Sequence, residues 1–330
     1  MTNTRIAVIG MGQIGRRHLQ ALTRIDRPIH IQVVDPSPSA LQQARKAYHD
    51  MKPPRYPQHV EYFSRLDSLS PHLHLAIIAT TAEVRKATVE QLLRLKNVHR
   101  LILEKVVFQY PDDFVNINKV LQEKNVKTWV NCPLRIYPFF QELKKNIKCQ
   151  TKEPAPINYF LSGCQFNLAS NTIHHLDLFS YLTETTQVTL DESLLSKQVL
   201  PNKRKGFMEF TGTLQGSTNA GDRITLTSYP SGASPLLLHV NNNHVRCIAK
   251  FNENKAWVSY SPTWSWKEVD FHVPYQSNLT HLVAQQILDE DYCKLPTYST
   301  SWQLHLPLLH SLTRHLHSTG NWSEKRCPIT

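Results

Sequence analysis

The chain has 330 residues, a hydrophobic content of 41% and a formal net charge of +11 at pH 7. The length predicts about two domains, and no apolar run approaches the roughly twenty residues of a membrane-spanning helix. The basic residues are spread along the chain in short clusters, such as residues 203–205. We therefore expect neither a nucleic-acid nor a membrane partner, and the positive charge suits an anionic small molecule instead.

The chain's first residues lead directly into an apolar segment and leave no room for a signal peptide. We therefore expect a cytoplasmic protein. Six cysteines are scattered without a CxxC spacing or a paired His/Cys pattern. This distribution predicts reduced thiols that mostly serve packing, and it predicts no metal site.

Three of the ten glycines fall within the six residues 10–15. An apolar run over residues 6–9 precedes this cluster, and an amphipathic segment over residues 13–24 follows it. The pattern predicts a strand, a glycine turn and a helix, which is the arrangement that opens a dinucleotide-binding fold.

Each glycine of the turn has a predicted role. Gly10 permits the tight turn, Gly12 lets a pyrophosphate approach the backbone, and Gly15 lets the helix pack closely on the strand. The N–H groups at the start of the helix, at Gln13 and Ile14, then face the phosphates. These five residues are therefore candidate cofactor contacts.

Asp35 ends a second apolar run, residues 30–34, about twenty residues after the glycine turn. An acid at this place accepts hydrogen bonds from the ribose hydroxyls of the adenosine and repels a 2′-phosphate. No arginine follows Asp35, although the Ser37 hydroxyl could contact such a phosphate. The sequence favours NAD over NADP as the cofactor.

Helices and strands continue to alternate after Asp35. The sequence predicts helices over residues 39–48, 82–95 and 112–123 and strands over residues 60–63, 73–78, 100–103 and 127–130. Strands that alternate with helices of this length favour a parallel, doubly wound sheet. We therefore expect a Rossmann dinucleotide-binding domain over residues 1–130.

Polar residues follow two of these strands, where ligands of an open parallel sheet bind. Thr80 and Thr81 follow one strand, and Glu104 and Lys105 follow another. We expect cofactor contacts from Thr80, Thr81 and Glu104. A lysine in a partly buried, positively charged setting can exchange a proton with a substrate hydroxyl, so Lys105 is a candidate catalytic and substrate-binding residue. Alternatively, it is a surface lysine at a strand end.

The second half of the chain, residues 131–330, has a different pattern. It predicts helices over 137–147 and 173–182, then strands over 207–214, 223–228, 236–240, 244–251, 255–261 and 266–273, and finally helices over 278–289 and 301–319. Successive strands without intervening helices predict an antiparallel sheet. We expect a second domain of α/β type over these residues.

A polar segment opens the predicted helix at residues 173–182. His174 and Asp177 are three residues apart and share one helix face. A histidine is a natural second proton handler, and Asp177 would hold it or a substrate hydroxyl. Ser170 and Asn171 precede them as candidate substrate contacts. The alternative is a histidine that only caps or packs the helix.

Arg135 follows the strand over residues 127–130. A guanidinium there could bind a substrate carboxylate or phosphate through two hydrogen bonds. The alternative is an ordinary surface arginine.

Together these residues resemble the glucose-fructose oxidoreductase, inositol dehydrogenase and rhizopine-catabolism (Gfo/Idh/MocA) family. The matching positions are residues 10–15, Asp35, 79–81, 104–105, Asn131, Arg135, Pro138 and 174–177. The resemblance implies a Rossmann domain and an α/β domain with an open, mostly antiparallel sheet that binds substrate and mediates oligomerisation. It implies NAD(P)-dependent hydride transfer to or from a sugar or cyclitol, with the lysine as acid or base and the histidine beside it, in a homodimer or homotetramer.

The chain departs from the family at two places. Val106 stands where the family usually has proline, and Ser170 stands four residues before His174, where polyol dehydrogenases of the family commonly carry aspartate. A serine cannot exchange a proton as a carboxylate does. A non-catalytic dinucleotide-binding sensor or interaction protein of the same fold is therefore the alternative function.

Two further segments resemble family members encoded with surface-polysaccharide or sialic-acid-like sugar biosynthesis. These segments are residues 164–166 and 327–330. They make a nucleotide sugar or an acidic sugar the preferred substrate.

Overall fold

The computed structural model describes residues 4–149, 155–320 and 322–330. The described residues form two compact units, one from the ranges 1–108, 112–131 and 274–299 and the other from 109–111, 132–273 and 300–330. The sequence pattern predicts a single domain boundary, near residue 130. In the structure, the segment 274–299 returns to the first unit.

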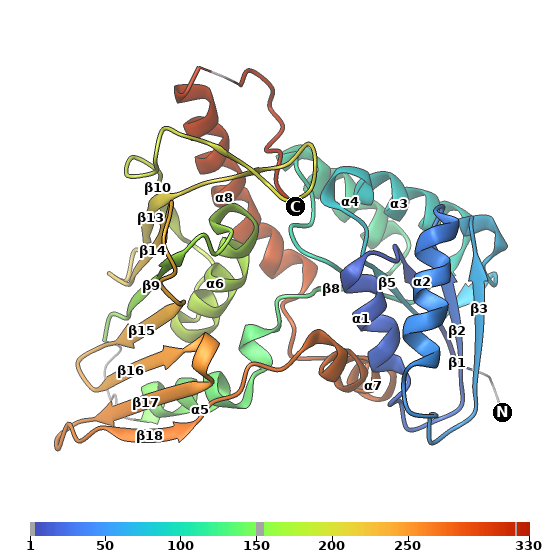
Figure 1. The fold of residues 1–330 in the computed structure, drawn as a ribbon, viewed down its shortest axis with the longest axis horizontal. Coiled ribbons are helices and arrows are strands. Elements are labelled where there is room, and N and C mark those ends of the chain that lie inside the picture. Colours follow the sequence, from blue (N-terminus) through green and yellow to red (C-terminus); the bar gives the residue numbers. More distant parts are fainter. Residues whose placement is uncertain (1–3, 150–154, 321) are drawn as a thin grey trace. The chain divides into compact units, whose positions relative to one another are not determined.

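A six-stranded parallel sheet forms the centre of the first unit (Figure 1), with strand order β3-β2-β1-β5-β7-β8. Its strands are β1 (Thr4–Ile9), β2 (Ile29–Val34), β3 (Gln58–Phe63), β5 (Leu75–Ile78), β7 (Arg100–Leu103) and β8 (Lys127–Val130). A short parallel pair consists of β4 (His72–Leu73) and β6 (Asn97–Val98). The strand order reverses at β1, as in dinucleotide-binding folds.

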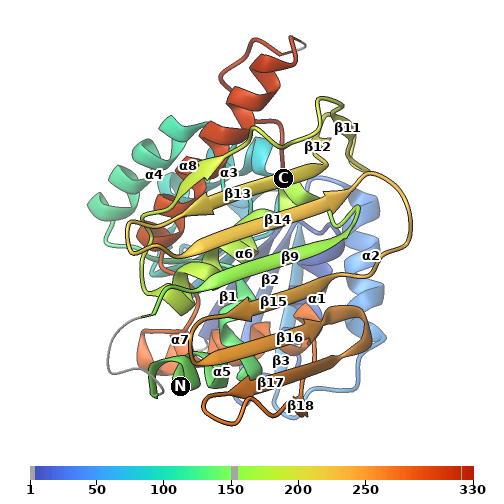
Figure 2. The ribbon, with the colours of Figure 1, turned by 90° about the vertical axis from the view of Figure 1, so that its left-hand side faces the viewer.

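Helices cover both faces of this sheet, with α1 and α2 on one side and α3 and α4 on the other (Figure 2). They are α1 (Gln13–Leu22), α2 (Pro38–His49), α3 (Ala82–Leu95), α4 (Pro111–Glu123) and α7 (Thr280–Glu290), with 3₁₀ turns η1 (Leu66–Ser68) and η4 (Gln276–Asn278). Most residues of the central strands are buried, for example residues 6–9 of β1 and all of β5, because both faces are covered. The expected doubly wound domain is confirmed.

An eight-stranded sheet forms the centre of the second unit, with strand order β10-β13-β14-β9-β15-β16-β17-β18. Its strands are β9 (Asn158–Cys164), β10 (Thr189–Asp191), β13 (Gly212–Ser217), β14 (Arg223–Tyr229), β15 (Leu237–Asn241), β16 (Val245–Lys250), β17 (Lys255–Tyr260) and β18 (Lys267–Asp270). All neighbouring pairs are antiparallel except β9 with β14. The expected mostly antiparallel sheet is confirmed.

Helices of the second unit leave one face of this sheet open, and Figure 2 shows that face with α6 behind it. The remaining elements are α5 (Pro138–Cys149), α6 (Leu168–Thr183), α8 (Tyr298–Ser318), the pair β11 (Leu200–Pro201) and β12 (Met208–Glu209), and the turns η2 (Pro133–Ile136) and η3 (Phe251–Glu253).

Strand β9 is the main element that the sequence analysis did not predict. It lies in the middle of the sheet, between β14 and β15. Its Gly163 is closely packed, because a Cβ there would lie 3.1 Å from Cα of Leu236. Two predicted strands are also divided in the structure: residues 73–78 fall in β4 and β5, and residues 207–214 fall in β12 and β13.

No helix of the described residues is long and apolar enough to cross a membrane. The described cysteines Cys132, Cys164, Cys247, Cys293 and Cys327 are not joined in disulfide bonds. The side chain of Cys149 lies outside the described residues.

Candidate dinucleotide and substrate sites

The predicted cofactor residues lie along the carboxyl edge of the parallel sheet. Backbone hydrogen bonds of 2.7–3.0 Å join the residue after each strand to the neighbouring strand. They run from the N–H groups of Gly10, Ala79, Glu104 and Asn131 to the carbonyls of Val34, Ile9, Ile78 and Leu103, respectively. The structure therefore brings the glycine turn, the threonines and the Glu-Lys pair to one edge.

The three glycines of the turn meet different surroundings. Gly10 has a φ of +93°, and a Cβ there would lie 2.8 Å from the backbone nitrogen of Thr80. A Cβ on Gly15 would lie 1.8 Å from the carbonyl oxygen of Gly10, so the helix and turn are in direct contact there. A Cβ on Gly12 would meet nothing within 4 Å. Gly12 also begins α1 without a side-chain cap, so this helix start is open to a phosphate.

Asp35 is held rigidly beside the glycine turn. Its Oδ2 accepts a hydrogen bond from the backbone N–H of Met11 at 2.6 Å, and its Oδ1 accepts one from the N–H of Ser37 at 2.8 Å. Each carboxylate oxygen can accept a further hydrogen bond. The Oγ1 of Thr80 is buried and has no hydrogen-bond partner among the described residues. The open helix start, the fixed acid and this hydroxyl fit a dinucleotide.

A buried polar network surrounds Glu104. The Nε2 of His18 lies 2.9 Å from Oε1 of Glu104, and the His18 Nδ1 lies 2.8 Å from Oγ1 of Thr280. The Asn131 amide donates to the same Glu104 oxygen and also to Oε1 of Gln276, at 3.0 Å. The sequence alone did not indicate His18, Gln276 and Thr280, because their partners are remote in the chain.

Glu104 is ionised by this network. Burial alone raises the pKa of its carboxyl, but the hydrogen bond and charge of His18, the Asn131 amide and the Lys105 ammonium outweigh burial and hold the pKa below its usual value. A fixed carboxylate therefore directly precedes the half-buried Lys105. The peptide bond from Lys105 to Val106 is cis.

Arg85, also missed from the sequence, joins two of the strand-end loops. Its side chain is fully buried, and its guanidinium donates to the carbonyls of Thr80 and Val106 and, at 3.0 Å, of Val107. One side chain on α3 thus holds the loop after β5 to the loop that carries Lys105. We infer that Arg85 is a positioning residue.

In the second unit the structure pairs Arg135 with Asp177. Nε of Arg135 donates to Oδ2 at 2.8 Å, and Nη2 donates to Oδ1 at 2.7 Å. The guanidinium also lies 5.2 Å from the ring centroid of Tyr181. Asp177 is fully buried, and burial raises the pKa of its carboxyl to about 6 although Arg135 opposes this. The predicted contact of Asp177 with His174 or a substrate hydroxyl stays a prediction.

The start of α6 is held by an acid that the sequence analysis did not single out. The carboxylate of Glu209, on β12, accepts hydrogen bonds from the Ser170 hydroxyl, from the Ala169 N–H at 2.9 Å and from the Asn202 amide at 2.9 Å. Burial raises the pKa of Glu209. Ser170 therefore has a carboxylate beside it, one helical turn before His174.

Glu209 also lines a cavity of about 300 Å³ in the second unit. Its other walls include Asn167, Asn202, Lys203 and Ser228. The Ser228 hydroxyl is buried without a hydrogen-bond partner among the described residues. This cavity combines hydrogen-bonding groups with a lysine, which suits a polar ligand.

The two histidines of α6 have different surroundings. His174 is partly exposed. His175 is buried with its Nδ1 2.7 Å from the Tyr159 hydroxyl, and burial lowers its pKa to about 3. Asn171 donates to the carbonyl of Phe166 at 2.7 Å. Of the two histidines, only His174 is accessible to a ligand.

The parallel sheet, the glycine turn and the fixed acid after β2 define a dinucleotide-binding protein of the Rossmann type. Residues 4–132 match the family model Gfo/Idh/MocA, described as the oxidoreductase family with an NAD-binding Rossmann fold. This part of the chain is similar to the Gfo/Idh/MocA family, and the match identifies the chain as an NAD(P)-dependent oxidoreductase by class. No curated protein matches the chain.

Solved structures share the fold across both units. The UDP-N-acetylglucosamine 3-dehydrogenase GnnA from Acidithiobacillus ferrooxidans is 15% identical, with a TM-score of 0.72 over 94% of this chain and 97% of that one. An oxidoreductase from Agrobacterium radiobacter in complex with NAD⁺, L-tartaric acid and magnesium is 15% identical, with a TM-score of 0.70 over 97% of each chain. A super-repressor mutant of Gal80p from Saccharomyces cerevisiae is 14% identical, with a TM-score of 0.71 over 98% and 100%.

Proposed function

We propose that the chain transfers a hydride between a nicotinamide coenzyme and a CH–OH carbon of a sugar, cyclitol or nucleotide sugar. The main support is the Glu104–Lys105 pair, which lies on the same sheet edge as the glycine turn and is fixed by His18, Asn131 and Arg85. The likeness of fold to a UDP-N-acetylglucosamine dehydrogenase supports a nucleotide sugar as the first substrate to test.

Lys105 is the proposed acid or base. In the oxidation direction its Nζ takes the proton of the substrate hydroxyl, and in reduction it returns that proton to the alkoxide oxygen. Bound NAD supplies the hydride acceptor, and its reduced form the donor. The Glu104 carboxylate keeps a negative charge beside Lys105 and fixes the backbone from which the lysine extends.

Residues of the second unit are the proposed substrate contacts. His174 orients the substrate or assists proton transfer, and Ser170 and Asn171 contact substrate hydroxyls. Arg135 binds an anionic group, and its bidentate pair with Asp177 fixes the orientation of its guanidinium. We propose a positioning role for Asp177 through Arg135, in addition to the contact with His174 predicted from the sequence.

Coenzyme binding and turnover test the proposal separately. Fluorescence titration with NADH and NADPH is expected to show binding, with tighter binding of NADH because of Asp35. Wild type incubated with NAD⁺ and a panel of UDP-N-acetylglucosamine, UDP-glucose, the free sugars and inositol is expected to form NADH with at least one of them. A protein that binds neither coenzyme contradicts the proposal.

Lys105→Met separates the enzyme from the non-catalytic alternative. We expect kcat to fall by about 100-fold or more, the range for loss of a general acid or base, while NADH binding remains. An unchanged kcat would remove Lys105 from the mechanism. Tight coenzyme binding by wild type, without turnover of any member of the panel, would favour the sensor or interaction protein.

A further inference from the structure

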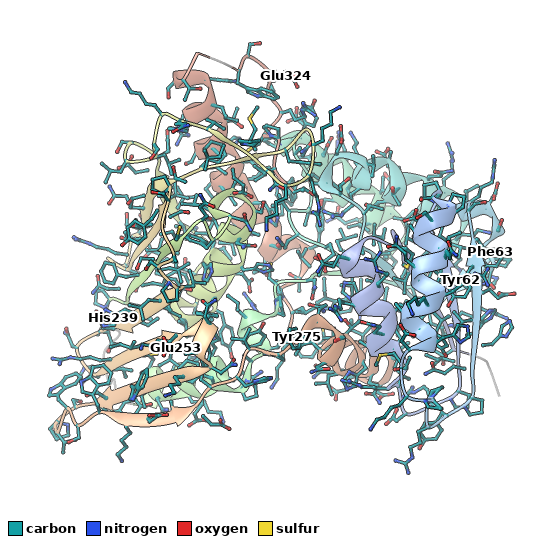
Figure 3. All side chains as sticks on the ribbon, in the orientation of Figure 1. Tyr62, Phe63, His239, Glu253, Tyr275 and Glu324 are labelled. Atoms are coloured by element: carbon teal, nitrogen blue, oxygen red, sulfur yellow. The ribbon has the colours of Figure 1, made fainter. Side chains whose placement is uncertain are left out.

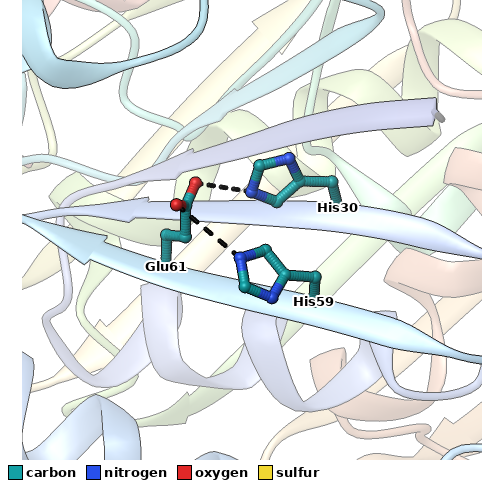
Figure 4. A group of neighbouring side chains, drawn as sticks. All are labelled: His30, His59 and Glu61. Carbon is teal, nitrogen blue, oxygen red and sulfur yellow. Dashed lines mark hydrogen bonds and ion pairs between the residues drawn. The ribbon is translucent and has the colours of Figure 1, made fainter.

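Three potential metal ligands lie together on the first unit, away from the Glu-Lys pair. His30 on β2 and His59 on β3 are directly paired in the parallel register, so their side chains leave the same face of the sheet. Glu61 lies two residues beyond His59 and therefore shares that face. Figure 4 shows both imidazole rings directed at the Glu61 carboxylate.

The separations of the ligand atoms are those that a small divalent ion requires. Nε2 of His30 lies 2.6 Å from Oε2 of Glu61, and Nε2 of His59 lies 3.6 Å from Oε1. One potential ligand atom from each residue lies within 4.8 Å of the others. Metal–ligand bonds of about 2.0–2.2 Å in a tetrahedral zinc site place neighbouring ligand atoms about 3.3 Å apart. Side-chain rotations that move the ligand atoms by roughly an ångström would therefore bring them to the spacing of a zinc site. The strands would not need to move.

A second residue orients the carboxylate. Gln32, the register partner of Glu61, is buried, and its amide donates to Oε2 of Glu61 at 3.0 Å. Its own carbonyl oxygen accepts the N–H of Ser70 at 2.9 Å. Gln32 is thus fixed at both ends of its amide. An outer hydrogen bond of this kind to a ligating carboxylate is a general feature of protein metal sites.

The cluster is accessible without unfolding. The side chains of His30, Glu61 and His59 are 13%, 37% and 67% exposed, respectively. Access therefore increases toward His59, and water can occupy a remaining coordination position.

We propose that His30, His59 and Glu61 form a binding site for Zn²⁺ or a chemically similar divalent transition ion. Two imidazole nitrogens and one carboxylate are a ligand set that zinc accepts, and calcium or magnesium would favour oxygen ligands alone. The ion cross-links the edge strand β3 to β2. His30 precedes Asp35 by five residues along the chain, which corresponds to about 16 Å of extended strand. The site is therefore separate from the proposed coenzyme site.

Zn²⁺ and Co²⁺ are the probes that test this site on the full chain after treatment with a chelator. Competition with a chromophoric chelator is expected to show one Zn²⁺ site that His59→Gln and Glu61→Gln each weaken by more than about tenfold. Co²⁺ is expected to give visible absorption bands of a tetrahedral site in wild type that the variants lose. Zn²⁺ is also expected to raise the melting temperature of wild type more than that of the variants.

His72→Gln is the matched control, because His72 is an exposed histidine of the same unit outside the cluster. We expect it to bind Zn²⁺ like wild type. Circular dichroism and NADH titration show whether each variant is folded, so a folding defect is recognised independently of metal binding. Equal Zn²⁺ affinity of wild type, His59→Gln and Glu61→Gln would overturn the proposal, and so would the absence of a Zn²⁺ site in wild type.

Discussion

Gly12 and Gly15 are three residues apart, but they constrain the molecule in different ways. Gly12→Ala places its methyl group in open space at the start of α1, in a backbone conformation, φ −60° and ψ −173°, that alanine adopts. We expect the free energy of unfolding to change by less than about 1 kcal/mol. NADH affinity is expected to fall by about tenfold or more, because the methyl group occupies the approach of the pyrophosphate. Urea unfolding and fluorescence titration measure the two quantities.

Gly15→Ala is the matched comparison. Its methyl group would overlap the carbonyl oxygen of Gly10, so we expect a loss of about 3 kcal/mol or more in stability. A Gly12→Ala protein with unchanged NADH affinity would contradict the assignment of the helix start as the phosphate site.

Asp35→Asn tests the choice of coenzyme. The amide oxygen can still accept the Met11 N–H, which the carboxylate accepts at 2.6 Å, but the negative charge that repels a 2′-phosphate is lost. We expect NADH to bind more weakly and NADPH to bind more tightly, so the dissociation constant of NADPH divided by that of NADH falls. A ratio equal to that of wild type would show that Asp35 does not select the coenzyme.

Local rules account for the glycines and Asp35, because their roles depend on the turn and strand in which they stand. The partners of other residues could not be predicted from the local sequence. His18 lies within a predicted helix, but its contacts, Glu104 and Thr280, are 86 and 262 residues away. Glu209 meets Ser170 across 39 residues. Only the folded structure shows that these side chains make polar contacts in the interior and do not lie on the surface.

A buried ion pair joins Arg135 of η2 to Asp177 of α6. Folding raises the pKa of Asp177 from 3.8 to about 6. Between these values the folded state binds the proton and the unfolded state does not, so this group reduces stability as the pH rises from about 4 to about 6. Above that range both states are ionised, and the cost of the buried charge is fully present.

Arg135→Met is expected to extend this dependence to higher pH. Without the guanidinium, the pKa of Asp177 rises further, and an uncompensated carboxylate is buried at neutral pH. We expect a loss of about 3–5 kcal/mol near pH 8 and a smaller loss near pH 5, where Asp177 is protonated. Urea unfolding at both pH values measures the difference. Equal losses would show that Arg135 acts through packing alone, for example against Tyr181.

The bounds of elements with a clear apolar pattern were predicted more accurately than those of irregular elements. The helix over 82–95 and the strands over 100–103 and 127–130 have the predicted bounds, because their apolar residues follow one face or form a continuous run. Strand β9 contains Ser162, Gly163 and Cys164 and no flanking turn signal as clear as those near β15 and β16. Its central place depends on pairing with strands more than sixty residues later.

The open face of the eight-stranded sheet carries apolar side chains. Phe160 and Leu237 are exposed large hydrophobic residues, and the Phe160 ring stacks on His239, which Figure 3 labels, at 6.1 Å between centroids. Such an exposed apolar surface suits a second protein surface. We predict that the chain forms a homodimer or homotetramer, as its resemblance to the Gfo/Idh/MocA family implies, through this face.

Phe160→Glu tests that assembly. A charge in the centre of the face is expected to convert the oligomer to a monomer, measured as a halved or quartered mass by light scattering. Leu282→Glu, an exposed leucine on α7, is the control and should keep the wild-type mass. A monomeric wild type would contradict the prediction, and an unchanged mass of Phe160→Glu would place the interface elsewhere.

The return of residues 274–299 to the first unit affects how this protein can be divided. The strand β8 has its Val130 N–H bonded to the Pro296 carbonyl at 3.0 Å, and Trp129 forms a bridge with Thr297. A fragment cut after residue 131 would lose these contacts and would leave His18 without Thr280. A version of the first unit that folds on its own therefore requires residue 131 to be linked directly to residue 274. A chimaera with a related protein must exchange the N-terminal segment and residues 274–299 together.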